Sequence, residues 1–254
     1  MKDKILLGDC LELLKDIPDG SVDCVICDLP FGTTACKWDV VIPFEPLWEQ
    51  YNRITKENAA ILLFGVNPFL CDVINSNREN FRYEIVWKKT LPVGFFNARR
   101  CPLRSHENIA VFYRKLPTYN PQMRISDKPK RCTTIASKTN GVYGEINKKE
   151  NWKDNGMRFP IDVVEFKRDV KGYGNERTLH PTQKPVDLIA YLIRTYSNEG
   201  DIILDNTCGS GTTAIAAIRE KRHFICMEKD EHYYQIACER VKKELMQPMI
   251  DFDD

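Results

Sequence analysis

Hydrophobic and polar positions along most of this chain follow the spacing of strands and helices in turn. Short apolar runs predict strands, and several are apolar throughout, as parallel strands covered on both faces are. These runs lie at residues 4–9, 22–28, 59–65, 83–89, 107–114, 201–205 and 223–228. Apolar residues spaced three or four positions apart predict helices at residues 10–17, 44–55, 68–77, 185–197, 211–220 and 231–245. This alternation predicts an α/β fold with a mostly parallel central sheet and helices on both faces.

The pattern fails between residues 115 and 178. Hydrophobic periodicity fades there, and only residues 161–166 have the pattern of a strand. Residues 115–177 hold fourteen Lys or Arg against eight Asp or Glu, while the whole chain has a net charge of +1. Such a segment is typical of a surface that meets a polyanion, and equally of a solvated insertion. We therefore expect three parts, residues 1–114, 115–178 and 179–254, the middle one an irregular insertion.

The composition is that of an ordinary soluble protein, with 254 residues of which 43% are hydrophobic and 29% charged. The apolar runs are shorter than the roughly eighteen residues of a membrane span, and the first residues do not have the pattern of a secretory signal. A cytoplasmic location and no membrane contact are expected. Ten cysteines occur mostly singly, and Cys24 and Cys27 form a CxxC pair inside an apolar strand. Buried, free thiols are therefore expected rather than disulfides, and no metal site.

The strand that ends at Asp205 leads directly into the turn N-T-C-G-S-G and a helix. Gly209 and Gly211 permit a tight turn and close approach of a ligand, although close helix packing also selects glycine. Glu228 ends the next strand, where it can accept hydrogen bonds from ribose hydroxyls. The full dinucleotide fingerprint is absent, and the Asp205 carboxylate would repel a pyrophosphate but suits a cation such as the amino group of methionine. This pattern favours S-adenosylmethionine over NAD.

A second acidic residue, Asp28, follows the apolar strand at residues 22–27 and opens the segment D-L-P-F-G. On its own, this pattern is as typical of a strand cap followed by a turn as it is of a functional site. If its strand neighbours the one that ends at Asp205, both carboxylates lie at the carboxyl edge of the sheet, where ligands of open α/β sheets bind.

The segment D-L-P-F-G, followed far downstream by H-P-T-Q-K-P and then by D-N-T-C-G-S-G-T-T, resembles the bacterial and phage DNA amino-methyltransferases. The order, catalytic motif first and cofactor motif last, is similar to that of the β-class adenine-N6 enzymes. The resemblance covers residues 4–114 and 179–240. It implies a circularly permuted class I methyltransferase fold in which residues 1–114 form the catalytic half, residues 179–254 the cofactor-binding half, and residues 115–178 a target-recognition insertion.

In this family a tetrapeptide of the form (D/N/S)PP(Y/F) holds a base flipped out of the duplex. The resemblance assigns this catalytic role to Asp28, Leu29, Pro30 and Phe31, with Leu29 departing from the pattern. It implies that the Asp28 carboxylate and the carbonyl of residue 29 accept the hydrogens of the exocyclic amino group as its nitrogen attacks a methyl sulfonium. The Phe31 ring would stack on the base.

Other aromatic residues near this motif allow two interpretations. Trp38 and Asp39 are candidates to close over the base pocket, although Trp38 is as typical of a core. The segment V-W-K-K, with Trp87 and Lys88, resembles a strand that lines the target pocket. Phe95 and Phe96 are instead interpreted as ordinary core residues.

The resemblance implies a site for S-adenosylmethionine and no metal. The predicted cofactor residues lie after the first strand, in H-P-T-Q-K-P, in the glycine turn and after the last strand: Asp9, His180, Thr182, Gln183, Lys184, Asp205, Thr207, Gly209, Gly211, Thr212, Thr213 and Glu228. In this set Lys184 would meet the methionine carboxylate, and H-P-T-Q-K-P also has the pattern of a helix start.

Basic residues beside the catalytic half and in the insertion are the predicted contacts to DNA phosphates, which position a protein rather than specify a sequence. They are Lys88, Arg99, Arg100, Arg104, Lys128, Lys130, Arg131, Lys148 and Lys149. Solvated surface charge explains any single one of them equally well.

The sequence therefore predicts a site-specific DNA adenine-N6 methyltransferase that acts on double-stranded DNA. A homodimer and a cognate restriction endonuclease are possible partners that the resemblance suggests. Aspartate rather than serine at residue 28 favours adenine, and cytosine-N4 methylation is the nearest alternative. Two other classes stay open: a nicotinamide-dependent oxidoreductase on the glycine turn, and a DNA-binding regulator with an impaired core, because of Leu29.

Overall fold

The computed structural model of the chain describes residues 2–34, 36, 39–126, 155–167 and 183–246. The chain divides into two compact units, residues 1–120 with 162–254, and residues 121–161. In the smaller unit, β6 (Arg124–Ile125) and β7 (Met157–Arg158) pair antiparallel. Among the described residues, none of the helices combines the length and apolar character that crossing a membrane requires.

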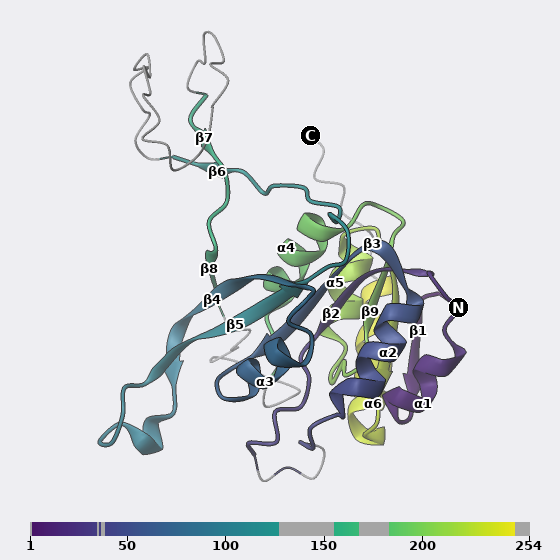
Figure 1. Cartoon of the computed structure of the whole chain (residues 1–254), viewed down its shortest axis with the longest axis horizontal. Helices are drawn as coiled ribbons and strands as arrows, with labels where there is room; N and C mark the ends of the chain where they lie inside the picture. The colour runs from purple at the N-terminus through teal and green to yellow at the C-terminus, as the bar shows by residue number, and fades with distance from the viewer. Residues whose placement is uncertain (1, 35, 37–38, 127–154, 168–182, 247–254) are drawn as a thin grey trace. The chain divides into compact units, whose positions relative to one another are not determined.

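The larger unit is built on an eight-stranded sheet that is mostly parallel (Figure 1). Its strand order is β1-β10-β9-β2-β3-β5-β4-β8, and β5 runs antiparallel to both of its neighbours. In chain order the strands are β1 (Lys4–Leu7), β2 (Val22–Cys27), β3 (Thr55–Gly65), β4 (Phe81–Val93), β5 (Arg104–Phe112), β8 (Val163–Phe166), β9 (Ile202–Asp205) and β10 (His223–Glu228). The predicted α/β class and mostly parallel sheet are confirmed.

Helices cover both faces of this sheet, and two separate cores result. The helices are α1 (Cys10–Leu13), α2 (Phe44–Ile54), α3 (Phe69–Ser76), α4 (Val186–Tyr196), α5 (Thr212–Arg219) and α6 (Glu231–Met246), with 3₁₀ turns η1 (Leu14–Asp16) and η2 (Phe95–Asn97). Successive strand residues point to opposite faces. Val25 and Cys27 of β2 therefore pack with α1, α2 and α3, whereas Cys24 and Ile26 pack with α4 and α5.

The strand order brings the two ends of the chain together at the centre of the sheet. β9 and β10 lie between β1 and β2, and β2 pairs parallel with both β9 and β3. Because parallel strands end at the same edge, Asp28 after β2 lies beside Asp205 at the end of β9. The adjacency expected for these two residues if their strands were neighbours is confirmed.

The segment predicted as an insertion, residues 115–178, contributes to both units. Residues 115–120 and 162–167 belong to the larger one, where β8 pairs parallel with β4. Asn120 joins this segment to α4, because its backbone N–H donates to the Thr195 carbonyl at 2.7 Å. Residues 127–154 and 168–178 lie outside the described residues. The assignment of the insertion to target recognition stays a prediction.

The nine described cysteines are free. Five are buried, as expected: Cys10, Cys24, Cys27, Cys208 and Cys226. The expectation that the cysteines are buried is wrong for Cys36, Cys71 and Cys101, which are exposed. These three lie in loops and on the outer side of α3, where an isolated apolar residue in the sequence does not mark the core.

Candidate active site

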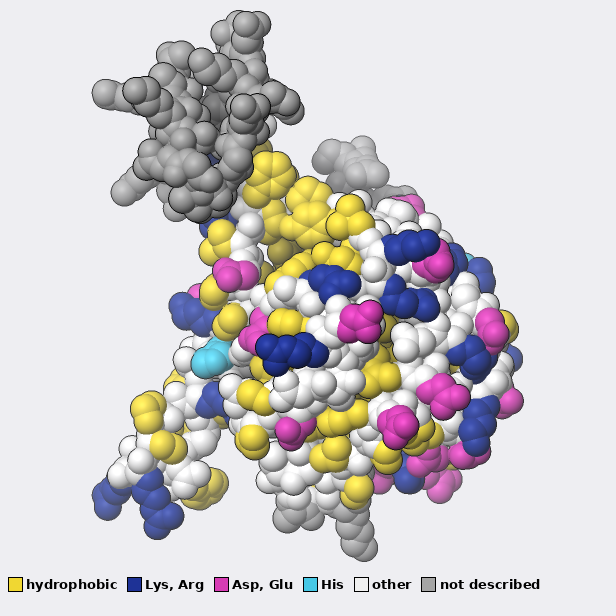
Figure 2. Space-filling model, in the orientation of Figure 1, with side chains coloured by type: hydrophobic (Ala, Val, Ile, Leu, Met, Phe, Trp, Pro, Cys, Tyr) yellow, Lys and Arg dark blue, Asp and Glu magenta, His cyan; other side chains and the backbone are white. Residues whose placement is uncertain are grey.

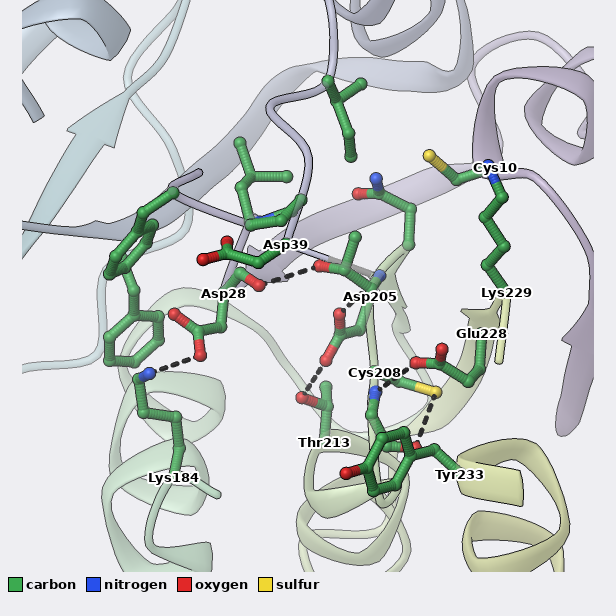
Figure 3. Close-up of a pocket in the computed structure, with 18 of the residues that line it drawn as sticks. Cys10, Asp28, Asp39, Lys184, Asp205, Cys208, Thr213, Glu228, Lys229 and Tyr233 are labelled. Atoms are coloured by element: carbon green, nitrogen blue, oxygen red, sulfur yellow. Dashed lines mark hydrogen bonds and ion pairs between the residues drawn. The ribbon is translucent and has the colours of Figure 1, made fainter. Parts of the chain in front are cut away.

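A cavity of about 380 Å³ opens at the carboxyl edge of the sheet, beside the ends of β2, β9 and β10 (Figure 3). Most of the predicted catalytic and cofactor residues line it: Asp9, Asp28, Leu29, Pro30, Phe31, Gln183, Lys184, Asp205, Thr207, Gly209, Thr212, Thr213 and Glu228. Gly211 is not among the residues that line it. His180 and Thr182 lie outside the described residues.

The loop after β2 is anchored on both sides of the tetrapeptide. Leu29 is only 3% exposed and belongs to the core on the α1–α3 face. The Phe31 ring packs on the Phe69 ring, with centroids 4.8 Å apart and planes at 31°. Phe31 also lines the cavity, so the ring is supported from behind while part of it faces the pocket.

Asp39 closes the same loop from its far end. Its carboxylate accepts backbone N–H groups of Gly32, Thr33 and Thr34 at 2.8, 2.9 and 2.6 Å. Burial acts to raise the pKa of Asp39, but these hydrogen bonds outweigh it and lower the pKa. Asp39 lines the cavity, as its predicted role at the base pocket requires, and Trp38 lies outside the described residues.

Asp28 is the first of four side chains of alternating charge, Asp28, Lys184, Glu107 and Lys89, which form a charge row. Its Oδ2 accepts a hydrogen bond from Lys184 Nζ, Lys184 Nζ lies 3.4 Å from Glu107 Oε2, and Glu107 Oε1 accepts from Lys89 Nζ. The Lys184, Glu107 and Lys89 side chains are 9%, 10% and 4% exposed. Buried charges of this kind persist only when each one has an opposite charge within reach. Here each member of the row has such a neighbour.

The row fixes the charges of its members to different degrees. Burial raises the pKa of Asp28, Lys184 opposes this rise, and Glu107 adds to it. For Lys184, burial acts to lower the pKa, but Asp28 and Glu107 outweigh it and raise the pKa. For Glu107, burial acts upward, but Lys184 and Lys89 lower the pKa to about 2. Lys184 and Glu107 are therefore firmly charged, and Lys184 does most to lower the pKa of Asp28, with a smaller contribution from Lys89.

The second oxygen of Asp28 is unsatisfied. Asp28 Oδ1 is buried and accepts no hydrogen bond from any of the described residues. A buried acceptor without a donor is costly unless a ligand supplies one. Because Asp28 lines the cavity, this oxygen is suited to accept an N–H group of a bound molecule.

Neutral donors hold the other carboxylate of this edge, Asp205. Its Oδ1 accepts the Thr207 N–H at 3.1 Å and its Oδ2 accepts the Thr213 hydroxyl at 2.5 Å. Burial raises the pKa of Asp205 to about 7, and these two hydrogen bonds oppose the rise. Glu228 accepts the backbone N–H groups of Gly209 and Asp230, each at 2.8 Å, and burial raises its pKa as well.

The glycine turn is in direct contact with the tetrapeptide. The Thr207 hydroxyl donates to the backbone carbonyl of Asp28 at 3.1 Å. In the same turn Gly209 lines the cavity. Gly211 instead packs on α6, where a Cβ would lie 2.9 Å from the Cβ of Ala237, and its φ is +79°. Close helix packing therefore accounts for this second glycine.

Among the described residues, the charge on the cavity wall is negative. Six carboxylates of this part of the chain line the cavity: Asp9, Asp28, Asp39, Glu107, Asp205 and Glu228. Three basic residues of the same part face them: Arg104, Lys184 and Lys229. Asp9 caps the start of α1 by accepting the Leu11 N–H at 3.0 Å and pairs with Lys229 at the same distance. An excess of carboxylates favours a cationic ligand over a polyanionic one.

Lys89 and Glu107 were not among the predicted site residues. In V-W-K-K the predicted residues were Trp87 and Lys88, but Trp87 and Lys89 share the buried face of β4, while Lys88 is exposed and pairs with Glu165 at 2.8 Å. Neither Trp87 nor Lys88 is among the residues that line the cavity. The alternation of strand residues, counted from the large apolar Trp87, is the signal that would have identified Lys89.

Apart from Lys88, the predicted DNA contacts fall into three groups. Arg104 lines the cavity, whereas Arg99 and Arg100 are exposed in the turn between β4 and β5. The remaining predicted contacts lie outside the described residues: Lys128, Lys130, Arg131, Lys148 and Lys149. In the same turn, Phe95 and Phe96 are 65% and 105% exposed, so the interpretation of these rings as core residues is wrong.

Comparison with known proteins agrees with this arrangement. A family model described as DNA methylase matches residues 22–239. The Type II methyltransferase M.BglII of Bacillus subtilis is 30% identical over 253 residues, which covers 92% of this chain and 67% of that protein.

Two solved structures share the fold of the chain. The crystal structure of the M1.HpyAVI–SAM complex has a TM-score of 0.60 at 23% identity, over 93% of this chain and 98% of that one. The PvuII DNA methyltransferase, which is cytosine-N4-specific, has a TM-score of 0.65 at 15% identity, over 96% and 91%. Both are class I methyltransferases, and the predicted fold class is confirmed.

Proposed function

The chain belongs to the N6/N4 DNA methylase family, and from that premise we propose that it transfers a methyl group from S-adenosylmethionine to the N6 amino group of adenine in double-stranded DNA. The observation that carries this proposal is the hydrogen bond of 3.1 Å between the Thr207 hydroxyl and the carbonyl of Asp28. It joins the cofactor turn to the catalytic tetrapeptide. Direct transfer requires donor and acceptor to be held together in one pocket.

The residues around the glycine turn fit S-adenosylmethionine, and M1.HpyAVI, of the same fold, was solved with that cofactor. When bound, the cofactor supplies an electrophilic methyl group on a positively charged sulfur. In this proposal Asp205 accepts its ammonium group. Glu228 keeps lone pairs for ribose hydroxyls, because each carboxylate oxygen accepts two hydrogen bonds and one is in use on each. The two phosphates of NAD would instead face this group of carboxylates.

On the acceptor side, Asp28 holds the amino group. Its Oδ1, which is buried and accepts no hydrogen bond from the described residues, accepts one N–H of the exocyclic amine. Lys184 holds Oδ2 and orients the carboxylate. Positive charge develops on the amino nitrogen during the attack, and a preoriented carboxylate stabilises that charge. The carbonyl of Leu29 is the second acceptor, and Leu29 itself is anchored in the core.

Cytosine N4 is the second candidate target, because the PvuII enzyme shares the fold and is described as cytosine-N4-specific. Both bases present an exocyclic amine that the same two acceptors can bind. Aspartate at residue 28, rather than serine, supports adenine. The homodimer, the cognate endonuclease and the cytoplasmic location stay predictions.

The test is expression in a host without DNA methylation, followed by base-resolved sequencing of its DNA. We expect N6-methyladenine in one sequence context. If N4-methylcytosine is the only modified base, the target is cytosine and not adenine. Unmodified DNA would refute the methyltransferase activity.

The matched variants are Asp28→Ala and Asp72→Ala. The first should lose at least about 10²-fold in methyl transfer, the size expected for loss of a group that stabilises transition-state charge. Its affinity for S-adenosylhomocysteine should persist. Asp72 is exposed on α3, away from the cavity lining, and its replacement should change neither quantity.

A further inference from the structure

The hairpin of β4 and β5 extends beyond the sheet and ends in an ordered turn (Figure 1). Gly94 opens the turn with φ +92°, and η2 follows directly. The turn is closed by its own backbone: Asn97 N–H donates to the Gly94 carbonyl at 2.9 Å, and Arg100 N–H to the Asn97 carbonyl at 2.8 Å. Its side chains are therefore presented on a defined support.

The side chains of this turn are apolar and positive. Leu91, Phe95 and Phe96 are 60%, 65% and 105% exposed. Residues 90–106 contain three Arg and no Lys, Asp or Glu. In Figure 2 the projecting end of the hairpin carries yellow and dark blue side chains and no magenta ones. Exposed aromatic rings in an unopposed positive field mark a contact with a negatively charged partner.

The hairpin also begins at the cavity. Arg104, the first residue of β5, lines the cavity, as does Glu107 further along the strand. The register shifts between the pairs Lys88↔His106 and Val93↔Arg104, so four residues of β4 face one of β5. A bulge of this kind bends a strand and redirects the residues beyond it. The hairpin therefore runs from the pocket wall, at Arg104 and Glu107, out to the turn.

We propose that this tip, residues 91–103, docks on double-stranded DNA beside the target base, with Phe96 inserted into the base stack and Arg99 and Arg100 on the flanking phosphates. The inference rests on the proposed function. When the target base leaves the duplex, its neighbours are unstacked, and an apolar ring that enters the stack covers their exposed faces. Two copies of the tip would repel each other through their like charges, which favours DNA over a second copy of this chain.

The first experiment compares two duplexes that carry the sequence methylated by the wild type, one fully paired and one with the target base mispaired. A mispaired base leaves the stack at lower cost. For Phe96→Ala we expect kcat/KM to fall by about 10-fold or more on the paired duplex and by less than about threefold on the mispaired one. Phe96→Trp should retain activity on both. Leu245→Ala, at a residue 65% exposed on α6, is the control and should change neither.

Two further measurements do not depend on turnover. Fluorescence of 2-aminopurine at the target position should rise less with Phe96→Ala than with the wild type. The double variant Arg99→Ala, Arg100→Ala should lower the slope of log affinity against log salt by about 2, one phosphate contact for each arginine.

Three results would overturn the inference: equal activity of Phe96→Ala and wild type on the paired duplex, equal losses on both duplexes, or a change of oligomeric state in Phe96→Ala with unchanged preference between the duplexes. The last result would assign the tip to a second copy of the chain. Wild-type protein inactive on both duplexes would refute the proposed function, and the salt dependence would then still test whether the tip binds DNA.

Discussion

Two carboxylates face one cavity in different surroundings. Asp28 is paired with Lys184, which Glu107 holds in turn, whereas neutral donors hold Asp205. Burial raises the pKa of both, but of the two only Asp28 has a lysine that opposes the rise. The difference teaches that the fold itself supplies a positive charge beside Asp28, whereas the proposed function leaves Asp205 to the ammonium group of the ligand.

The largest expected effect comes from removing that lysine. In Lys184→Met, Asp28 loses the group that lowers its pKa, so the carboxylate is protonated over a wider range. We expect kcat at pH 7 to fall by about 10²-fold and the acidic limb of the pH profile to move to higher pH. Steady-state kinetics between pH 5 and 9 measure both.

The matched variant Lys184→Arg keeps the charge and should recover part of the activity. The affinity of the two variants for S-adenosylhomocysteine distinguishes two roles of Lys184. If Lys184 orients Asp28, this affinity should stay within about threefold of wild type. A large loss of that affinity with unchanged kcat would return Lys184 to the role at the methionine carboxylate that the family resemblance suggested.

A smaller effect is expected at Asp205. With a pKa of about 7, this carboxylate is mostly neutral at pH 6 and mostly ionised at pH 8. If it binds the ammonium group, calorimetric affinity for S-adenosylhomocysteine should be about 10-fold lower at pH 6 than at pH 8. Asp205→Asn should bind weakly at both values. Asp28 and Glu228 face the same cavity, so a pH dependence that persists in Asp205→Asn would assign the titration to one of them.

The smallest effect is expected at the far end of the charge row. Lys89→Met leaves Glu107 with Lys184 as its partner, which draws Lys184 from Asp28, and kcat should fall by about fivefold. Lys88→Met, one residue earlier on the exposed face, should leave kcat unchanged. Replacing both partners, Lys89→Met with Glu107→Gln, should restore kcat, because Lys184 then has Asp28 alone. A double variant with a kcat as low as that of Lys89→Met would contradict the inference that Lys89 acts on Asp28 through Glu107 and Lys184.

Much of the fold follows from the sequence, for physical reasons that particular elements illustrate. The runs that form β2 and β9 are apolar on both faces and end in polar turns, which is typical of buried parallel strands. The rule that parallel strands share a carboxyl edge then predicts that Asp28 and Asp205 lie together if their strands are neighbours. Strong periodicity, as in α4, identifies the helices in the same way.

The charge row could not be predicted from the sequence. It requires the antiparallel pairing of β4 with β5, which sets Lys89 near Glu107. It also requires the position of the segment before α4, which brings Lys184 to Asp28 and Glu107. No local pattern encodes these distances. The exposure of Phe96 is a second example, because composition alone does not tell a core ring from a ring on a projecting turn.

The hydroxyl of Thr207 on the carbonyl of Asp28 has a consequence for the order of events. A ligand that orders one end of this contact also orders the other end. Thermodynamic linkage requires the resulting change in affinity to be the same for both ligands. The methyl donor and the nucleic acid should each raise the affinity of the other by the same factor, whichever arrives first. A complex that holds only one of the two then binds that ligand more weakly than the complex that holds both.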